Sequence, residues 1–371
     1  MPSTAPKLGK KVVGRAHGED KIRVKVVSKN GVDRAHFTEL PNRHPELRFV
    51  FDLQTRDYDW FVVYDDLPSR YSERLTLGSE TLACPPENTI LLTYEPSAVK
   101  FYGEDYVNQF AHVLTSQEPE MLPHAGRRDA PPVGVWKYGG VEDVFKHPAP
   151  PEKSAQVCVF LSNKRMHQTH TLGRKRFNFY NSLTELLPEL GIYGRGFRYV
   201  EKKAECLDRY RYHIAVENHI APHHWTEKLS DSFLGYCLPF YVGCPNAADY
   251  FPEESFIGLD IEDPRGAADT IREAIAGNEY EKRLPAIIEA RRRVIEDYNL
   301  ANFIGDTISA VTGGSHAARR ANSSRPPRVL SRHLIMRRRP AALLRYLLGK
   351  LRSRRRSSRR YNSKRWLNDG L

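Results

Sequence analysis

The alternation of apolar and polar residues between positions 210 and 257 predicts a strand, a polar loop, a helix and a second strand in succession. Residues 212–216 form a short apolar run, and a polar loop rich in His follows it. An amphipathic helix opens at Thr226, and Pro239 prevents it from continuing far, so that residues 238–242 are typical of the next strand. Charged and amide side chains therefore gather where the first strand ends and the helix begins.

Apolar runs along the rest of the chain predict an α/β protein of two domains. Strand–helix alternation from 156 to 314 favours a parallel sheet covered by helices. Residues 123–152 are rich in Pro and Gly, which indicates a linker, so we expect domains at 1–150 and 151–314. The predicted strands lie at 22–27, 47–51, 60–64, 89–94, 110–115 and 156–161, and the other predicted helices at 174–187, 267–276 and 280–298.

Cations occupy the first turn of two predicted helices, where the helix dipole favours anions. One is Lys228, and the others are Arg174, Lys175 and Arg176 at the start of the helix at 174–187. The dipole disfavours each such cation by about 0.3–1 kcal/mol unless an anion lies between it and the helix end. Together the two helices predict a site for a diphosphate. For Lys228 alone, a solvated surface lysine is an equally good explanation.

Glu95 directly follows the predicted strand at 89–94. Catalytic carboxylates often project from the carboxyl ends of parallel strands into a ligand site. On position alone, however, a capping or surface glutamate is the simpler interpretation.

Two groups of residues suggest a metal site, but in both cases ordinary loop residues explain the pattern better than metal ligands do. Asp65 and Asp66 follow the strand at 60–64, but two acids in a loop that Leu67-Pro68 turns explain the pattern. The loop histidines have ligand-like spacing in part, but Pro222 interrupts it and the segment is not helical. These histidines are His219, His223 and His224.

The net charge of +12 is concentrated at the C-terminus, since residues 315–371 carry +17 and the rest of the chain −5. Pro340 can begin a helix in this basic tail, with arginines around an apolar side. Such a helix is typical of a membrane-surface anchor on anionic lipids, and the alternative is a disordered basic tail that binds nucleic acid nonspecifically. The apolar side would consist of Leu343, Leu344, Leu347, Leu348 and Leu351.

Composition narrows the class of protein further. An apolar content of 40% indicates a globular chain, and 371 residues suffice for two cores. Neither an apolar run of 18 residues nor an N-terminal signal sequence is present, and five Cys without CxxC spacing suit reduced thiols. These features predict a cytoplasmic protein, and the mildly acidic body argues against specific nucleic-acid binding.

The segment between 155 and 260 resembles the donor-binding signature of the α1,3/4-fucosyltransferases. The resemblance is carried by several blocks in the order and spacing of that family. The blocks are SNK with GRKRFNFYNSL (162–183), YGRG (193–196), AVEN (215–218), WTEKL (225–229), LPFYVGCPN (238–246) and YFPEESFI (250–257).

This resemblance implies a GT-B-like fold, in which two Rossmann-like domains face a cleft, here with the basic C-terminal tail added. It implies that the second domain binds GDP-fucose and the first binds the acceptor. Glu95 corresponds to the catalytic base, and Arg176 and Lys228 to the cations on the donor pyrophosphate. The remaining donor-binding positions are Ser162, Asn163, Asn218, Glu227 and His224, the last of which replaces a family Tyr unless it is a surface loop residue.

The implied reaction is inverting transfer of L-fucose to a hydroxyl of an N-acetylglucosamine-containing glycan, with α1,3 or α1,4 linkage. Two cations on the leaving group make a divalent metal or other cofactor unnecessary. With the basic tail, the resemblance implies a peripheral enzyme at the cytoplasmic membrane face, acting on lipid-linked or lipopolysaccharide glycans. The alternatives are a GT-B transferase for another nucleotide sugar, a non-catalytic nucleic-acid-binding protein led by the tail, and an inactive glycan-binding relative.

Overall fold

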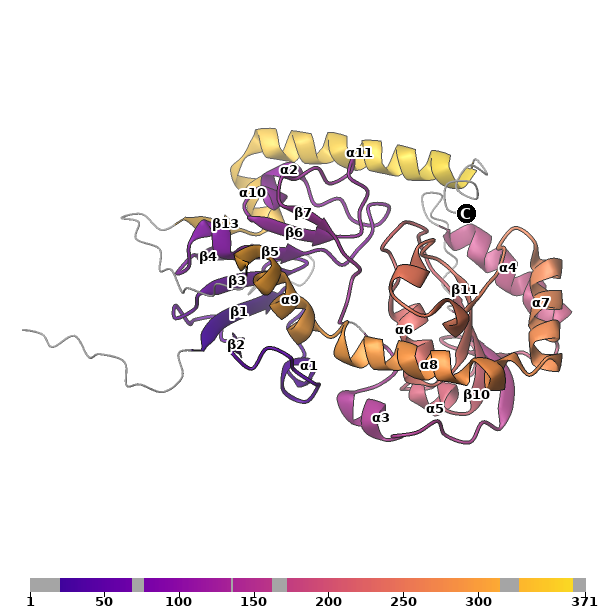
Figure 1. The fold of residues 1–371 in the computed structure, drawn as a ribbon. Coiled ribbons are helices and arrows are strands. Elements are labelled where there is room, and N and C mark those ends of the chain that lie inside the picture. Colours follow the sequence, from indigo (N-terminus) through magenta and orange to yellow (C-terminus); the bar gives the residue numbers. More distant parts are fainter. Residues whose placement is uncertain (1–20, 69–76, 135, 162–171, 314–326, 363–371) are drawn as a thin grey trace, which may run out of the picture.

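The computed structural model describes residues 21–68, 77–134, 136–161, 172–313 and 327–362. Two α/β lobes lie side by side, the N-terminal lobe in indigo and purple and the second lobe in pink and orange (Figure 1). Each lobe is built on a parallel sheet. The prediction of two Rossmann-like domains is therefore confirmed.

The first sheet has six parallel strands, and its centre is buried on both faces. Phe61, Val62 and Val63 are completely inaccessible to solvent, which is why this strand is continuously apolar. Five of its strands match predicted ones, but the sixth, β7, lies in the segment predicted as a linker. In sheet order the strands are β2 (Leu47–Val50), β1 (Ile22–Ser28), β3 (Trp60–Tyr64), β5 (Thr89–Leu92), β6 (His112–Thr115) and β7 (Arg127–Asp129).

The second sheet has five parallel strands with β10 at its centre. Ile214 of β10 pairs with Phe240 on one side and Val159 on the other. The strand–loop–helix–strand unit predicted from 210 to 242 is confirmed, with the helix α6 between β10 and β11. In sheet order the strands are β12 (Ile257–Gly258), β11 (Leu238–Val242), β10 (Tyr210–Val216), β8 (Ala155–Phe160) and β9 (Gly191–Tyr193).

Helices cover both sheets, and those predicted at 174–187, 267–276 and 280–298 are confirmed. In the first lobe the short helices are α1 (Ala35–Thr38) and α2 (Glu104–Val107), with the 3-10 turn η1 (Pro86–Asn88). The second lobe and its approaches contain α3 (Val141–Phe145), α4 (Gly173–Leu186), α5 (Ala204–Leu207), α6 (Glu227–Leu234), η2 (Ala247–Asp249), η3 (Glu253–Ser255), α7 (Pro264–Ala276) and α8 (Glu279–Glu296).

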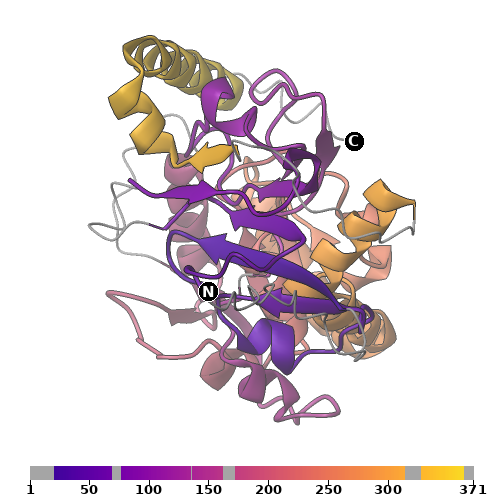
Figure 2. The same cartoon turned by 90° about the vertical axis from the view of Figure 1, so that its left-hand side faces the viewer.

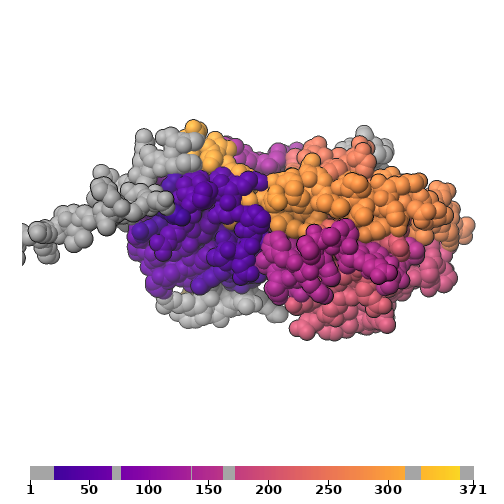
Figure 3. All heavy atoms as spheres, turned by 60° about the horizontal axis from the view of Figure 1, so that its bottom comes forward, coloured from indigo at the N-terminus to yellow at the C-terminus, as the bar shows by residue number. Residues whose placement is uncertain are grey.

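The helix α9 (Leu300–Thr312) returns from the second lobe to the first, although the sequence places it within the second domain. Its residues Ile304 and Ile308 join the same buried cluster as Val24 and Val26 of β1. Gly134, with φ of +77°, lies so close to Leu300 that a Cβ atom there would meet the leucine side chain at 2.2 Å. In Figure 3 the orange atoms, which belong to the segment that includes α8 and α9, adjoin both the indigo first lobe and the magenta part of the second.

Residues 327–362 pack on the first lobe and are not a separate tail. The strand β13 (Arg328–Leu330) pairs antiparallel with β4 (Ser79–Thr81), and the helices α10 (Arg332–Arg338) and α11 (Pro340–Asn362) follow. Val329, Ile335 and Ala342 are buried in the core on this side of the first sheet. Figure 2 shows both helices in yellow against the outer side of the sheet. The interpretation as a disordered tail is therefore wrong for these residues.

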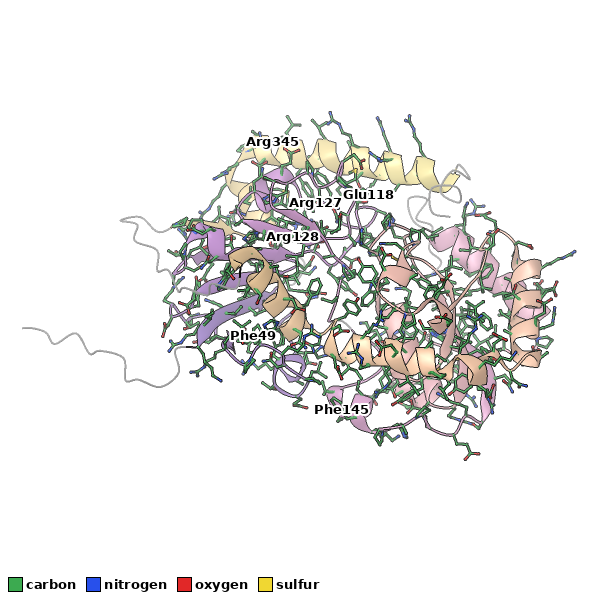
Figure 4. The ribbon with its side chains drawn as sticks, viewed as in Figure 1. Phe49, Glu118, Arg127, Arg128, Phe145 and Arg345 are labelled. Carbon is green, nitrogen blue, oxygen red and sulfur yellow. The ribbon has the colours of Figure 1, made fainter. Side chains whose placement is uncertain are left out.

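The helix α11 begins at Pro340, as predicted, and its leucine-rich side is left uncovered. Within the described ranges, no helix is both long enough and apolar enough to cross a bilayer. Arg345, labelled on α11 in Figure 4, forms an ion pair with Asp105. The Ser353 hydroxyl donates a hydrogen bond to the Ser97 carbonyl. The exposed leucines are Leu343, Leu344, Leu347, Leu348 and Leu351.

Candidate functional site

The carboxyl ends of strands from both lobes meet at one place. The Ser116 hydroxyl, just after β6, lies 2.9 Å from Nδ1 of His224 in the loop that precedes α6. Glu118 of the first lobe lies 3.3 Å from Nε2 of His219 in the same loop. Glu118 is on the side of the first lobe that faces the second (Figure 4). Because ligands of open α/β sheets bind beyond the carboxyl ends of their strands, this junction is the candidate site.

The first turn of α6 is built around a buried acid. Glu217 at the end of β10 is fully buried and accepts hydrogen bonds from the backbone N–H and the hydroxyl of Thr226. Thr226 is also the N-cap of α6, since its hydroxyl accepts from the backbone N–H of Lys228. One strand end is thereby fixed to the start of the helix.

Lys228 lies in the first turn of α6, as the sequence predicts, with Nζ 2.9 Å from Glu227 and 3.4 Å from Glu217. Burial disfavours its charge, but these two carboxylates raise the pKa of Lys228 above its ordinary value. Burial likewise acts against the charge of Glu227, but Lys228 and Lys203 lower the pKa of Glu227 to about 2. Both side chains are therefore charged at neutral pH.

Arg176 supplies a second cation to the same place from the first turn of α4. One of its terminal nitrogens donates to the carbonyl of Val216 and to the side-chain oxygen of Asn218. The charge of Arg176 acts to lower the pKa of Lys228, against the two carboxylates that raise it. Holding two like charges together costs free energy, which the carboxylates of Glu217 and Glu227 offset at Lys228 and which a bound anion would offset further. The structure thus brings together Arg176, Asn218, Glu227 and Lys228, four of the predicted donor-binding residues.

Glu95, just beyond β5, faces this cluster from the first lobe. Burial raises its pKa above the ordinary value, the Asp65 carboxylate raises it further, and Glu227 adds to the effect across the junction. Lys100 and Lys29 act in the opposite direction. A half-buried carboxylate with a raised pKa at a strand end can accept a proton from a bound hydroxyl group.

Asp65 is a buried anion that holds two cations near Glu95. It accepts hydrogen bonds from Lys100 at 2.6 Å and from the Tyr102 hydroxyl at 2.5 Å, and Lys29 lies 3.1 Å away. Burial acts against its charge, but chiefly Lys100 lowers the pKa of Asp65 to about 2. Sequence reasoning placed Asp65 only in a loop, because nothing in the chain pattern indicates its partners.

A cavity of about 340 Å³ opens beside Glu95 in the first lobe. Its walls come from the ends of β1, β3 and β5, from the linker around Trp136 and from α9. Tyr64, Tyr94 and Trp136 contribute aromatic surface. The linker is tied to the other lobe, since the backbone N–H of Lys137 donates to Asp231 of α6. The cavity is therefore placed next to the cations of the second lobe.

His224 is buried between the lobes, so the interpretation as a surface loop residue is wrong. Burial, together with the nearby His219 and Lys228, lowers its pKa to about 3, which keeps the ring neutral. Its Nδ1 is hydrogen-bonded to the Ser116 hydroxyl. His223 points elsewhere, toward the Tyr250 hydroxyl. Among the described residues, no three His, Cys, Asp or Glu side chains are grouped as metal ligands.

Two predicted donor-binding residues, Ser162 and Asn163, lie outside the described residues. The Asp65–Lys100–Tyr102 cluster and the wall residues Trp136 and His36 were missed by sequence reasoning. Only the position of Asp65 at a strand end could have suggested any of them.

The second lobe of this chain is similar in sequence to known proteins. Residues 150–279 match the family model described as "Glycosyltransferase family 10 (fucosyltransferase) C-term". A 4-galactosyl-N-acetylglucosaminide 3-alpha-L-fucosyltransferase 9 of Homo sapiens is 30% identical over 134 residues, which are 34% of this chain and 35% of that protein. The protein of the same name from Cricetulus griseus gives the same values. The match therefore spans about a third of these relatives' length.

The chain is also similar to solved structures. A crystal structure of an alpha1,3-fucosyltransferase with GDP-fucose is 14% identical, covers 86% of this chain and 96% of that chain, and has a TM-score of 0.46. One with GDP is 17% identical, covers 76% of this chain and 84% of that chain, and has a TM-score of 0.44.

Proposed function

We propose that the chain transfers L-fucose from GDP-fucose to a glycan hydroxyl with inversion, because residues 150–279 match the family model of the glycosyltransferase family 10 fucosyltransferases and the matched relatives are fucosyltransferases. The acceptor is a 4-galactosyl-N-acetylglucosamine unit and the linkage is α1,3, by analogy with the name of the matched relatives. The observation that carries this proposal is the pair of cations, Arg176 and Lys228, facing Glu95 across the junction of the lobes.

In this mechanism Glu95 accepts the proton of the attacking acceptor hydroxyl as that oxygen bonds to the anomeric carbon of fucose. The bond from that carbon to the GDP oxygen breaks in the same displacement, so configuration inverts. The raised pKa of Glu95 brings its basicity closer to what proton removal requires near neutral pH. The cavity beside Glu95 would hold the acceptor sugar.

Arg176 and Lys228 would stabilise the departing GDP. Negative charge on the diphosphate grows as the bond to fucose breaks, so both cations bind the transition state more tightly than the ground state. The N–H groups at the start of α6 would add to this stabilisation. Glu227 would accept a hydrogen bond from a sugar hydroxyl, and Asn218 would orient Arg176. In this proposal the two cations take the place of a metal.

A donor screen tests the proposal. The purified protein is incubated with GDP-fucose, GDP-mannose and UDP-linked sugars, each with 4-galactosyl-N-acetylglucosamine, and product linkage is determined by NMR. We expect transfer with GDP-fucose only and a new α1,3 bond to N-acetylglucosamine. Transfer from another nucleotide sugar at a higher kcat/KM would replace this proposal with the alternative donor.

We also propose that the enzyme is attached peripherally to an anionic membrane at the cytoplasmic face, through α11. Helical geometry places its exposed leucines on the side opposite Ala342, Ser353 and Ser357, which are buried against the first lobe. Arg354 and Arg355 continue the leucine side toward the helix end. An apolar side flanked by cations suits insertion at an anionic lipid surface. Lipid-linked or lipopolysaccharide glycans would then be presented to the first lobe.

Vesicle sedimentation tests this attachment. We expect the protein to sediment with vesicles that contain phosphatidylglycerol, and binding to weaken at least ~10-fold in the triple variant Leu344→Ser, Leu347→Ser, Leu348→Ser. Ile288→Ser is the matched control, because Ile288 is similarly exposed but lies on α8. Equal binding of the triple variant and the control would contradict the proposal.

A further inference from the structure

One buried polar atom in the cavity beside Glu95 has no hydrogen-bond partner among the described residues. It is Nδ1 of His36, on the short helix α1. The side chain is only 8% exposed and belongs to the cavity wall. Buried polar atoms in folded proteins are nearly always hydrogen-bonded, so an atom left without a partner in a cavity wall points to a ligand.

The protonation state and tautomer of the His36 ring determine which chemical group its Nδ1 can bind. Burial lowers the pKa of His36 below its ordinary value, although the nearby Asp33 partly opposes this shift. The ring is therefore neutral at pH 7 and carries one hydrogen. Nε2 lies 3.9 Å from the Asp33 carboxylate, which favours the hydrogen on Nε2. Nδ1 then keeps its lone pair and accepts a hydrogen bond, so its ligand must offer an O–H or N–H group.

Trp136 supplies an apolar surface next to this acceptor atom. The ring centroids of His36 and Trp136 are 4.5 Å apart, and both residues belong to the wall that also contains Glu95. Trp136 is held in place through its neighbour Lys137, whose backbone N–H donates to Asp231 of the second lobe at 3.0 Å. A ligand with one apolar face and polar edges therefore fits this corner.

We propose that His36 and Trp136 form the subsite for the acceptor sugar, in which the pyranose ring packs on Trp136 and one hydroxyl or amide N–H donates to Nδ1 of His36. The subsite fixes the sugar so that its reacting hydroxyl faces Glu95. This inference rests on the proposed function, because it takes the occupant of the cavity to be the acceptor. It assigns recognition of the acceptor to residues outside the segment that matches the family model.

Two substitutions at one position separate the hydrogen bond from the shape of the side chain. His36→Phe keeps a planar ring beside Trp136 but removes the acceptor atom. His36→Asn places an amide oxygen close to the position of Nδ1. We expect His36→Phe to raise the acceptor KM about tenfold and His36→Asn to change it about threefold or less, with the KM for GDP-fucose and the melting temperature unchanged in both.

The readout is steady-state kinetics with GDP-fucose and 4-galactosyl-N-acetylglucosamine, together with calorimetric binding of the same disaccharide without donor. An unchanged acceptor KM in His36→Phe would overturn the subsite. Equal losses in both variants, with a lowered melting temperature, would show a purely structural role and would also overturn it. If the wild type bound the disaccharide through His36 but transferred no fucose, the proposed function alone would fail.

Discussion

Glu95→Gln lowers kcat for fucosyl transfer by about 10²–10⁴-fold and leaves the affinity for GDP-fucose within about twofold of the wild type. The amide keeps the shape of the side chain but cannot accept the proton of the attacking hydroxyl. The donor cations are on the other lobe, so donor binding does not depend on this change. Single-turnover kinetics measures the first quantity, and calorimetric titration with GDP-fucose measures the second.

The pH dependence of turnover in the wild type and in Glu95→Gln tests whether Glu95 is the general base. Burial and the Asp65 carboxylate raise the pKa of Glu95 above its ordinary value of 4.5. The base works only when deprotonated, so wild-type kcat/KM should fall as the pH drops through this raised pKa. The residual activity of Glu95→Gln should lack that acidic limb. The pH at which this limb lies depends on the pKa of Glu95, and the charged groups that act on that pKa are Asp65, Lys29, Lys100 and Glu227.

A matched control is available at the other end of the same strand. Glu87 is exposed at the amino end of β5, so Glu87→Gln removes an equal charge far from the junction. We expect its kinetics and pH profile to equal those of the wild type. Retained turnover in Glu95→Gln, or an equal loss in both variants, would remove Glu95 from the role of base.

Sequence reasoning succeeded where the information is local. The strand 238–242 and the helix start at Thr226 follow from apolar runs, a capping residue and a proline within a few positions of each other. Lys228 and Arg176 were found because a cation in a first helical turn is unfavourable in itself. Each of these signals is contained in one turn of helix or one strand.

Prediction from the sequence failed where a strand or a side-chain environment depends on residues far away along the chain. β7 lies in a segment rich in Pro and Gly, and it forms a strand because β6 offers it an edge. Residues 328–330 pair with β4 some 250 positions earlier, which a basic, Arg-rich segment does not indicate. The environment of Asp65 depends on Lys100 and Tyr102, and the His36 subsite depends on Trp136 a hundred residues away.

The second large effect is expected at Lys228. Lys228→Met should lower kcat/KM by about 10²–10³-fold, because the methionine side chain cannot stabilise charge that develops on the departing diphosphate. It should also weaken GDP binding, so that the rise in melting temperature caused by GDP becomes smaller. Part of the loss will be structural, since Glu217 is fully buried and Lys228 is one of its charged neighbours.

Two further variants separate binding from stability. Lys228→Arg keeps the charge beside Glu217, so it should recover most of the melting temperature while recovering only part of kcat/KM, because the guanidinium geometry differs. Lys175→Met is the matched control, since Lys175 lies in the cationic first turn of α4 but pairs with Glu262. We expect Lys175→Met to keep the full GDP-induced rise in melting temperature. If Lys228→Met kept that rise as well, the diphosphate would not lie between the two helices, and the cation pair would instead serve the folding of the β10–α6 junction alone.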